Sequence, residues 1–441
     1  MSAPSIRVRL SAMFWLLHMT DAAALVLLSG HMADLGFSGV QISYVFATTA
    51  VAALVAPWVA GWLADRYCPS QLLLAGCYLL GCPLLAIAWR QTEFVPFWTA
   101  MAGVALIRVP ARILSTVVAF HHLEDSSRFG HIRVWGTAGW VFISWCLSLY
   151  LGLWEGGEEP GGSHMGDALL VAAVLSAATG AYCLTLPDTP PGNAGAKSLE
   201  LFSAFRLLRR REFAVLAMLG FVSSLVSPFF YNFSFLFLTD AAETGFAPST
   251  ANWVQSLGQV AEVGVLLCLA TSLRRVGIKR VLLLGAGAQC LRFAIFAAGE
   301  PVWLVVAGMA LHGMVFTFFF TGLAIAVDHF SDEENRASAQ GLMAFARSGI
   351  GALSGNFLSG QAPLAGSGVG WLADEALGVQ VESDLGAGRQ LDLQPRAVDG
   401  GRSGFGADGW RGIIDGSRRK LARQRGVPSR PEAVLAEGTR L

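Results

Sequence analysis

Eleven apolar runs, each about 20 residues long, follow one another through the first 360 residues of this chain. That is the length of helix needed to cross a bilayer. The composition agrees, because 54% of the residues are hydrophobic and only 14% are charged, against about 25% charged in soluble proteins. We therefore predict an all-α integral membrane protein. The predicted spans are Leu10–Gly30, Gln41–Leu63, Gln71–Trp89, Val95–Ala119, Val134–Leu153, Asp167–Leu186, Phe213–Leu238, Ala251–Leu273, Val281–Ala298, Val302–Val327 and Ala339–Gly360.

Positive charge alternates between successive loops. With a cytoplasmic N-terminus, the inner loops hold fifteen Lys and Arg residues, whereas the outer loops hold only Arg90. Cytoplasmic loops of membrane proteins carry such an excess. We therefore expect a multi-pass protein of the cell membrane whose N-terminus is cytoplasmic.

The spans fall into two groups. Residues 1–186 hold six spans, and residues 213–360 hold five. Residues 187–212 between them are rich in Pro, Gly and basic side chains, which predicts a cytoplasmic linker between two pseudo-equivalent bundles. Residues 361–441 contain no apolar run of spanning length and read as a polar, disordered tail. The second bundle therefore lacks an expected sixth helix, which suggests a truncation or a change of reading frame.

A polar stripe runs along the eighth predicted span. Asn252, Gln255, Gln259 and Glu262 are separated by three, four and three residues, so they share one face of a helix. An ionisable group at this depth costs at least ~2.5 kcal/mol and therefore tends to face a cavity. We interpret this face as the centre of a solute pathway.

Two arginines and an aspartate stand out in the first bundle. Arg108 and Arg112 are one turn apart on the fourth span, and Asp21 on the first span is the nearest acid by topology. One interpretation is a structural ion pair within the membrane. The other is an anion or proton relay along the cavity.

The fifth span opens with a donor-rich segment. Arg133, Thr137 and Trp140 recur on one helical face, and Gly136 and Gly139 allow a neighbouring backbone to approach. Arg133 and Trp140 are also typical anchors at a membrane interface. Beside the polar stripe, the set instead favours a site for a small polar solute.

Polar side chains also interrupt the later spans. On the seventh span, Asn232 follows Pro228, which can kink the helix and free a carbonyl group. On the tenth, Thr317 and Thr321 often bond their own backbone instead of a ligand. Arg292 and Arg347 are further charged residues within predicted spans, and each is a candidate functional residue.

Several classes of protein are excluded by what the sequence contains. The net charge is zero, which gives no reason to expect a nucleic-acid partner. The seven cysteines form no Cys-x-x-Cys pair and show no regular spacing with histidine, so we expect no metal site and no cofactor. No His/Asp cluster suggests a membrane-embedded enzyme.

The segment Gly61-Trp-Leu-Ala-Asp65-Arg66 follows the second span. Asp65 is placed to contact the end of a neighbouring helix while Arg66 holds the inner face. We interpret Gly61, Asp65 and Arg66 as a gating loop whose contact breaks when the two halves rock.

Together these features resemble the major facilitator superfamily, in the paired halves, the long middle loop and the Gly61–Arg66 segment. Within it, the chain is similar to the nucleoside:proton symporter family. The stretches that carry this likeness are Phe129–Trp140, Gln259–Glu262, Leu311–Gly313 and Arg336–Gly341.

The resemblance implies roles for individual residues. Those expected to contact nucleoside or to couple protons are Arg133, Thr137, Trp140, Asn232, Gln259, Glu262 and Thr317. Three departures from the family pattern matter. Thr317 stands where the family commonly has an acid, Asp21, Arg108 and Arg112 stand where it is usually uncharged, and a twelfth helix is absent.

We therefore expect a monomeric secondary transporter that takes up nucleosides with protons across the cytoplasmic membrane. Glu262, with Asp21 as a second candidate, would carry the proton. One alternative keeps the fold but moves an anionic aromatic or sugar-like solute, which the extra arginines would favour. Another is a truncated homologue that does not transport.

Overall fold

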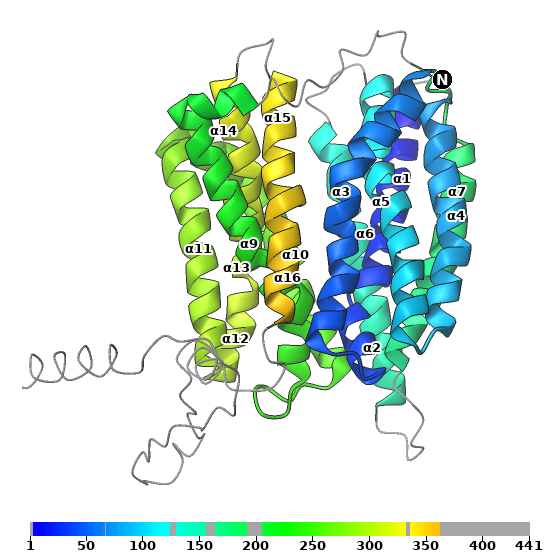
Figure 1. Ribbon diagram of the computed structural model, residues 1–441, viewed down its shortest axis with the longest axis vertical. Coiled ribbons are helices and arrows are strands. Elements are labelled where there is room, and N and C mark those ends of the chain that lie inside the picture. Colours follow the sequence, from blue (N-terminus) through cyan, green and yellow to red (C-terminus); the bar gives the residue numbers. More distant parts are fainter. Residues whose placement is uncertain are drawn as a thin grey trace, which may run out of the picture. The chain divides into compact units, whose positions relative to one another are not determined.

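The computed structural model describes residues 3–66, 68–123, 129–155, 164–191, 205–331 and 336–361. All of them belong to one structural unit, residues 1–389. The predicted tail and the middle of the predicted linker lie outside the described residues, as does the expected truncation. Within them the chain is helical throughout, with no strand (Figure 1).

The first half consists of six long helical segments, the first of which is interrupted. Its helices are α1 (Ala3–Leu25), α2 (Leu28–Asp34), α3 (Gly39–Arg66), α4 (Ser70–Arg90), α5 (Phe94–His122), α6 (Phe129–Trp154), η2 (His164–Gly166) and α7 (Asp167–Leu184). The second half has five further helical segments. They comprise η3 (Phe205–Arg209), α9 (Arg211–Thr239), α10 (Pro248–Val276), α11 (Ile278–Ala298), α12 (Val302–Met309), α13 (Leu311–Met314), η4 (Val315–Thr321), α14 (Gly322–Phe330), α15 (Arg336–Ala344), η5 (Phe345–Gly351) and α16 (Ala352–Gly360).

Each predicted span coincides with one of these helical segments. Nine described helices are long and apolar enough to cross a membrane, and α3 adds a shorter apolar stretch, Gly39–Val55. The predicted all-α membrane fold is therefore confirmed.

One local prediction is wrong. The backbone of α3 is helical through Arg66, so Gly61, Asp65 and Arg66 end a helix and do not form a loop. Their side chains lie outside the described residues, and the gating role stays a prediction.

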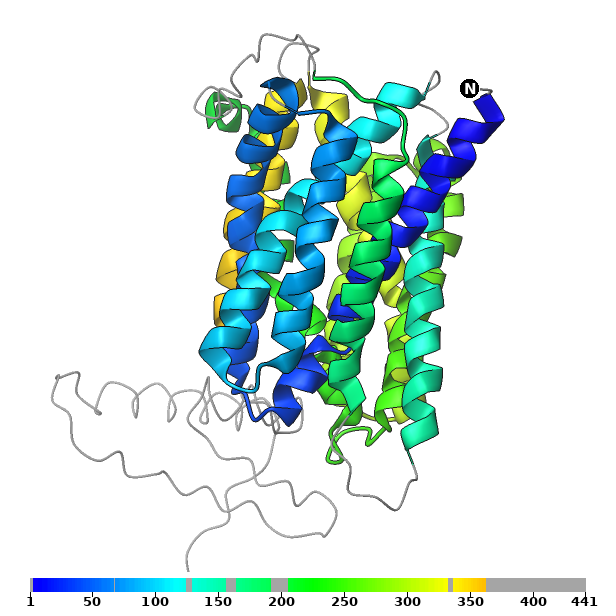
Figure 2. The same ribbon diagram turned by 90° about the vertical axis from the view of Figure 1, so that its right-hand side faces the viewer.

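Small residues let the helices of the first half pack closely. A Cβ atom at Gly139 on α6 would lie 2.5 Å from the carbonyl oxygen of Trp15 on α1, so only glycine permits this contact. Between α4 and α7, the hydroxyl of Ser176 donates to the carbonyl oxygen of Tyr78 at 2.6 Å. Figure 2 shows α1 in dark blue, inclined relative to its neighbours. These contacts hold α1 close to α6 and α4 close to α7.

The second half contains two π-helical segments, η4 and η5. They lie in the middle of the spans that run from α12 to α14 and from α15 to α16. A π-helical turn inside a span often marks a functional site, because it changes the direction of the side chains that follow.

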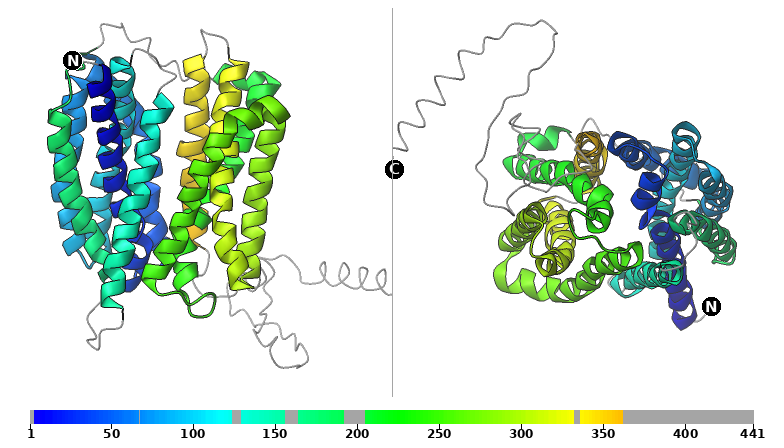
Figure 3. Two further views of the ribbon diagram at one scale, coloured as in Figure 1. Left: turned by 180° about the vertical axis from the view of Figure 1, so that it is seen from behind. Right: turned by 90° about the horizontal axis from the view of Figure 1, so that it is seen from below.

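The two bundles lie side by side (Figure 3) and are hydrogen-bonded at one end. Asn252 Nδ2 on α10 donates to the carbonyl oxygen of Ser144 at 2.8 Å and to Ser148 Oγ at 3.0 Å, both on α6. Ser43 Oγ on α3 lies 3.4 Å from Ser359 Oγ on α16. These contacts lie at the end that holds α2, opposite the N-terminus of α1 (Figure 1). We call it the closed end.

Candidate functional site

A cavity of about 540 Å³ lies between the two bundles. Its walls combine hydroxyl, amide, aromatic and arginine side chains. The first bundle contributes Leu25, Val26, Ser29, Phe46, Thr49, Ala50, Ala53, Arg108, Val109, Arg112, Trp140 and Ser144. The second contributes polar residues that include Ser224, Ser227, Asn232, Ser234, Asn252, Gln255, Ser256, Gln259, His312, Arg347, Ser348 and Asn356, with the aromatic residues Phe230, Tyr231, Phe316 and Phe320.

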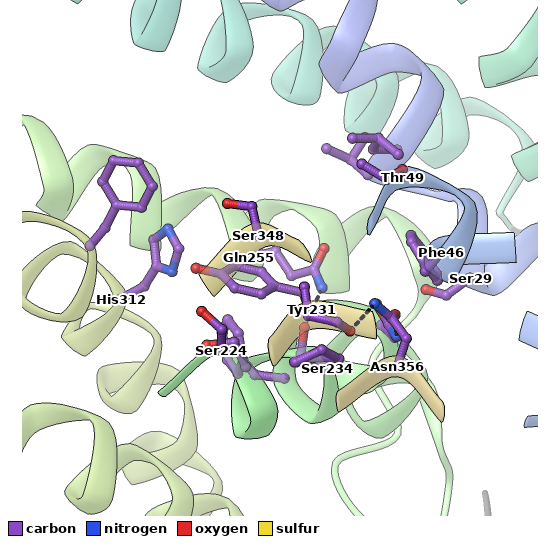
Figure 4. Close-up of a pocket in the computed structure, with 18 of the residues that line it drawn as sticks. Ser29, Phe46, Thr49, Ser224, Tyr231, Ser234, Gln255, His312, Ser348 and Asn356 are labelled. Carbon is purple, nitrogen blue, oxygen red and sulfur yellow. Dashed lines mark hydrogen bonds between the residues drawn. The ribbon is translucent and has the colours of Figure 1, made fainter. Parts of the chain in front are cut away.

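Figure 4 shows the two walls facing each other. Tyr231, Gln255 and Asn356 belong to the second bundle, whereas Phe46 and Thr49 stand across the gap on the first. Polar groups for orientation and aromatic faces for contact are the usual composition of a small-molecule site.

The polar stripe of α10 forms much of the second wall. Asn252, Gln255 and Gln259 all line the cavity. Gln255 Nε2 donates to Ser234 Oγ on α9 at 2.9 Å, which fixes this amide. The stripe therefore faces the cavity over three of its four predicted residues.

Glu262, the fourth residue, does not line the cavity. It lies one turn further along α10, and only 8% of it is exposed. Its Oε2 atom is 3.9 Å from Nε2 of His312, which does line the cavity. The close approach depends on Gly313, where a Cβ atom would lie 2.5 Å from the backbone nitrogen of Glu262. The carboxyl group therefore lies beside the imidazole and outside the cavity wall.

Of the residues predicted on α6, some line the cavity and others do not. Trp140 lines the cavity together with Ser144. Arg133 and Thr137 are half-buried and lie outside the cavity wall. They occupy earlier turns of α6, nearer to the end opposite the closed end.

Of the two predicted residues on α9 and η4, only Asn232 reaches the cavity. Its Nδ2 atom donates to Asn356 Oδ1 on α16 at 2.7 Å. Thr317 is fully buried, does not line the cavity, and its Oγ1 atom has no hydrogen-bond partner.

Asp21 lies between the two arginines of α5. Its Oδ2 atom accepts from Arg112, at 3.0 Å from Nε and 2.9 Å from Nη2. Arg108 Nε is 3.6 Å from Asp21 Oδ1, too far for a hydrogen bond. Both arginines line the cavity, whereas Asp21 is buried behind them.

Several cavity residues were not predicted. Asn356 and Ser348 lie on the last span, and Phe316 and Phe320 lie on η4. An amide within an apolar run, as at Asn356, was a usable signal. The π-helical turns that orient the other three leave no comparable pattern in the sequence.

Among the described residues, no group of three or more His, Cys, Asp or Glu side chains could hold a metal ion.

Two helical bundles around a central polar cavity define a transporter of the major facilitator type. The chain belongs to the nucleoside H+ symporter family, whose sequence profile matches residues 4–366. It is a multi-pass membrane transporter and not an enzyme.

Individual relatives agree with this placement. The protein YegT of Escherichia coli (strain K12) is 32% identical over 334 residues, which cover 74% of this chain and 77% of YegT. The xanthosine permease of the same organism is 30% identical over 384 residues, 81% of this chain and 88% of the permease.

Solved structures show the same fold. A variant of the nucleoside transporter NupG superposes with a TM-score of 0.73 at 26% identity, covering 81% of this chain and 91% of NupG. A D-xylose-proton symporter superposes with a TM-score of 0.60 at 13% identity, over 81% of this chain and 89% of the symporter, a likeness of fold alone.

Proposed function

We propose that this protein takes up nucleosides together with protons, by alternating access of one central site. Membership of the nucleoside H+ symporter family supports the reaction. So do relatives named nucleoside permease and xanthosine permease. The observation that carries the proposal is the cavity between the bundles, which has amide and aromatic side chains on its walls and a buried carboxyl group beside His312.

Trp140, Asn232 and Gln259 hold the nucleoside in this proposal. Trp140 offers a flat ring on which a base can stack. Asn232 and Gln259 are amides that both donate and accept, as the edge of a base or a ribose requires. Asn356 already accepts a hydrogen bond from Asn232. This bond either holds the Asn232 amide in position for the solute or is replaced by a bond from Asn232 to the solute.

Arg133 and Thr137 would join the site in another conformation. They share a helical face with Trp140 but lie on earlier turns. When the bundles rock, the turns of α6 that face the solute change.

Glu262 carries the coupled proton in this proposal. It is a carboxyl group buried within a span and next to a cavity-lining imidazole, through which a proton can pass. Asp21 is the second candidate, but its contacts with Arg108 and Arg112 favour a structural ion pair. Thr317 offers only a hydroxyl group and contributes no proton.

The closed end sets the direction of access. With the N-terminus on the cytoplasmic side, the hydrogen-bonded end faces outward and the cavity opens inward.

Uptake by the purified protein in liposomes tests this proposal. Labelled nucleosides should accumulate when the outside is more acidic than the inside, and only equilibrate without the gradient. Unlabelled carboxylates and sugars should not reduce the uptake of the labelled nucleosides. Absence of binding and of uptake would instead support a homologue that does not transport.

A further inference from the structure

Arginines give this cavity an unbalanced charge. Arg108 and Arg112 reach it from α5 and Arg347 from η5, whereas no Asp or Glu is among the described residues that line it. A cavity of this kind attracts anions, because its walls have a low dielectric constant and concentrate the field.

The wall formed by the first bundle has two arginines and one nearby carboxylate, so it carries one positive charge in excess. Asp21 bonds Arg112 directly, at 2.9 Å, and one carboxylate cannot neutralise two guanidinium groups. Arg108 is left with Nε and Nη1 buried and without hydrogen-bond partners. Its side chain is only 9% exposed. A buried guanidinium that shares one carboxylate with a second arginine, and leaves two of its nitrogens without hydrogen bonds, is costly at this depth unless a ligand completes its contacts.

The second wall repeats the imbalance. Arg347 Cζ lies 5.1 Å from the centre of the Phe320 ring, a contact that leaves its positive charge uncompensated. No ion pair is described for Arg347 in the part of the chain that the structure covers. Asp21 and Glu262 are the two buried carboxylates among the described residues. Asp21 is engaged by arginine, and Glu262 is the proposed proton carrier, which is neutral when loaded.

We propose that the cavity selects nucleosides that carry a negative charge over neutral ones, with Arg108 and Arg347 as the residues that read the charge. This inference rests on the proposed nucleoside transport. An anion held between the two side chains would attract both bundles and so favour closure around the solute. A charge on the base and a charge on a 5′-phosphate present the same chemistry to the arginines, and the experiment separates them.

Inosine and xanthosine form a matched pair of probes. They differ by one exocyclic carbonyl oxygen, at C2 of the base, and at mildly alkaline pH the base of xanthosine is ionised while that of inosine is neutral. Both are offered as labelled solutes to the protein in liposomes, at one fixed pH. We expect xanthosine to be preferred by about tenfold, as a charge-assisted hydrogen bond would give. Inosine 5′-monophosphate is added as a competitor.

Variants assign the preference to the arginines. Arg108→Gln and Arg347→Gln should each reduce it to about twofold or less, whereas Arg108→Lys should keep most of it. The matched control is Arg90→Gln, because Arg90 lies at the end of α4 and outside the cavity. The unfolding temperature and a single symmetric elution peak in detergent show that each variant is folded.

The outcomes separate two failures. Equal transport of inosine and xanthosine, with no inhibition by the monophosphate, would overturn the charge preference but leave nucleoside transport standing. Transport of neither nucleoside would overturn the proposed function itself. Strong inhibition by the monophosphate alone would support the preference and place the charge on the phosphate.

Discussion

Glu262 Oε2 and His312 Nε2 lie 3.9 Å apart, at the contact between α10 and α13. The imidazole lines the cavity, and the carboxyl group lies beside it without lining the cavity. In the proposed function, His312 offers a route by which a proton from the cavity can reach Glu262. Solute binding and protonation of a buried acid would then take place at neighbouring groups.

The first prediction concerns the proton carrier. Glu262→Gln keeps the shape and the hydrogen-bonding capacity of the side chain but cannot ionise. We expect nucleoside accumulation under a pH gradient to fall to the level measured without one, while exchange of labelled for unlabelled nucleoside persists. Both are measured in liposomes.

The matched control is Glu93→Gln, because Glu93 is an exposed acid before α5. It should leave gradient-driven accumulation unchanged. Full accumulation by the Glu262→Gln variant would assign the coupled proton to another group.

The second prediction concerns the glycine that brings these two side chains together. An alanine Cβ at Gly313 would lie 2.5 Å from backbone atoms of Ala261 and Glu262. Backbone cannot yield as a side chain can, so Gly313→Ala should destabilise the protein by about 1–3 kcal/mol, the usual cost of overpacking. This destabilisation would appear as a lower unfolding temperature in detergent and as weaker proton-coupled uptake of nucleosides.

Gly264→Ala on α10 is the control, because no heavy atom lies within 4 Å of its Cβ position. This variant should be as stable as the parent. If both variants unfold at the parental temperature, the contact between α10 and α13 is not tight.

The third prediction concerns Asp21. Asp21→Asn would leave Arg108 and Arg112 adjacent without a counter-charge. Removing one partner of a buried ion pair costs about 3–5 kcal/mol. Because the side chain of Arg112 is half-exposed, we expect a loss of stability at the lower end of this energy range. We expect a lower unfolding temperature, which the added change Arg112→Gln should partly restore.

An unchanged unfolding temperature in Asp21→Asn would show that the ion pair does not stabilise the fold. A loss of proton coupling with unchanged stability would instead favour Asp21 as a proton relay.

How far the sequence predicts this structure depends on the feature concerned. The spans are set by apolar length, a local property, and each predicted span is found as a helical segment. Trp140, Asn232 and Gln259 could be placed near a cavity from the sequence. Polar groups on one face of an apolar helix are costly in contact with lipid and therefore tend to face a cavity or another helix.

Glu262 shows what periodicity cannot decide. It shares a face with Gln259, but whether the cavity extends one turn further depends on how α10 and α13 cross, which is a tertiary property. Three cavity residues of η4 and η5, which are Phe316, Phe320 and Ser348, were not predicted for a related reason. The π-helical turns rotate Phe316 and Ser348 away from the positions that a regular helix would give them.

The last prediction concerns Asn252, which joins the bundles at the closed end. It makes two hydrogen bonds to α6, each worth about 1 kcal/mol. If that end opens during transport, the two bonds exist in only one of the two conformations. Asn252→Ala should therefore raise the population that is open at this end by about tenfold or more.

Spin labels can measure this population. Leu153 on α6 and Trp303 on α12 are exposed positions, one on each bundle, and labels there should show a longer distance in more molecules of the variant. Gln255→Ala is the control, because the bond of Gln255 to Ser234 lies within one bundle. An identical distance distribution in Asn252→Ala and the parent would mean that these two bonds do not hold the closed end. The hydrogen bond from Ser249 to Glu155 and the packing of α3 against α16 would then close it.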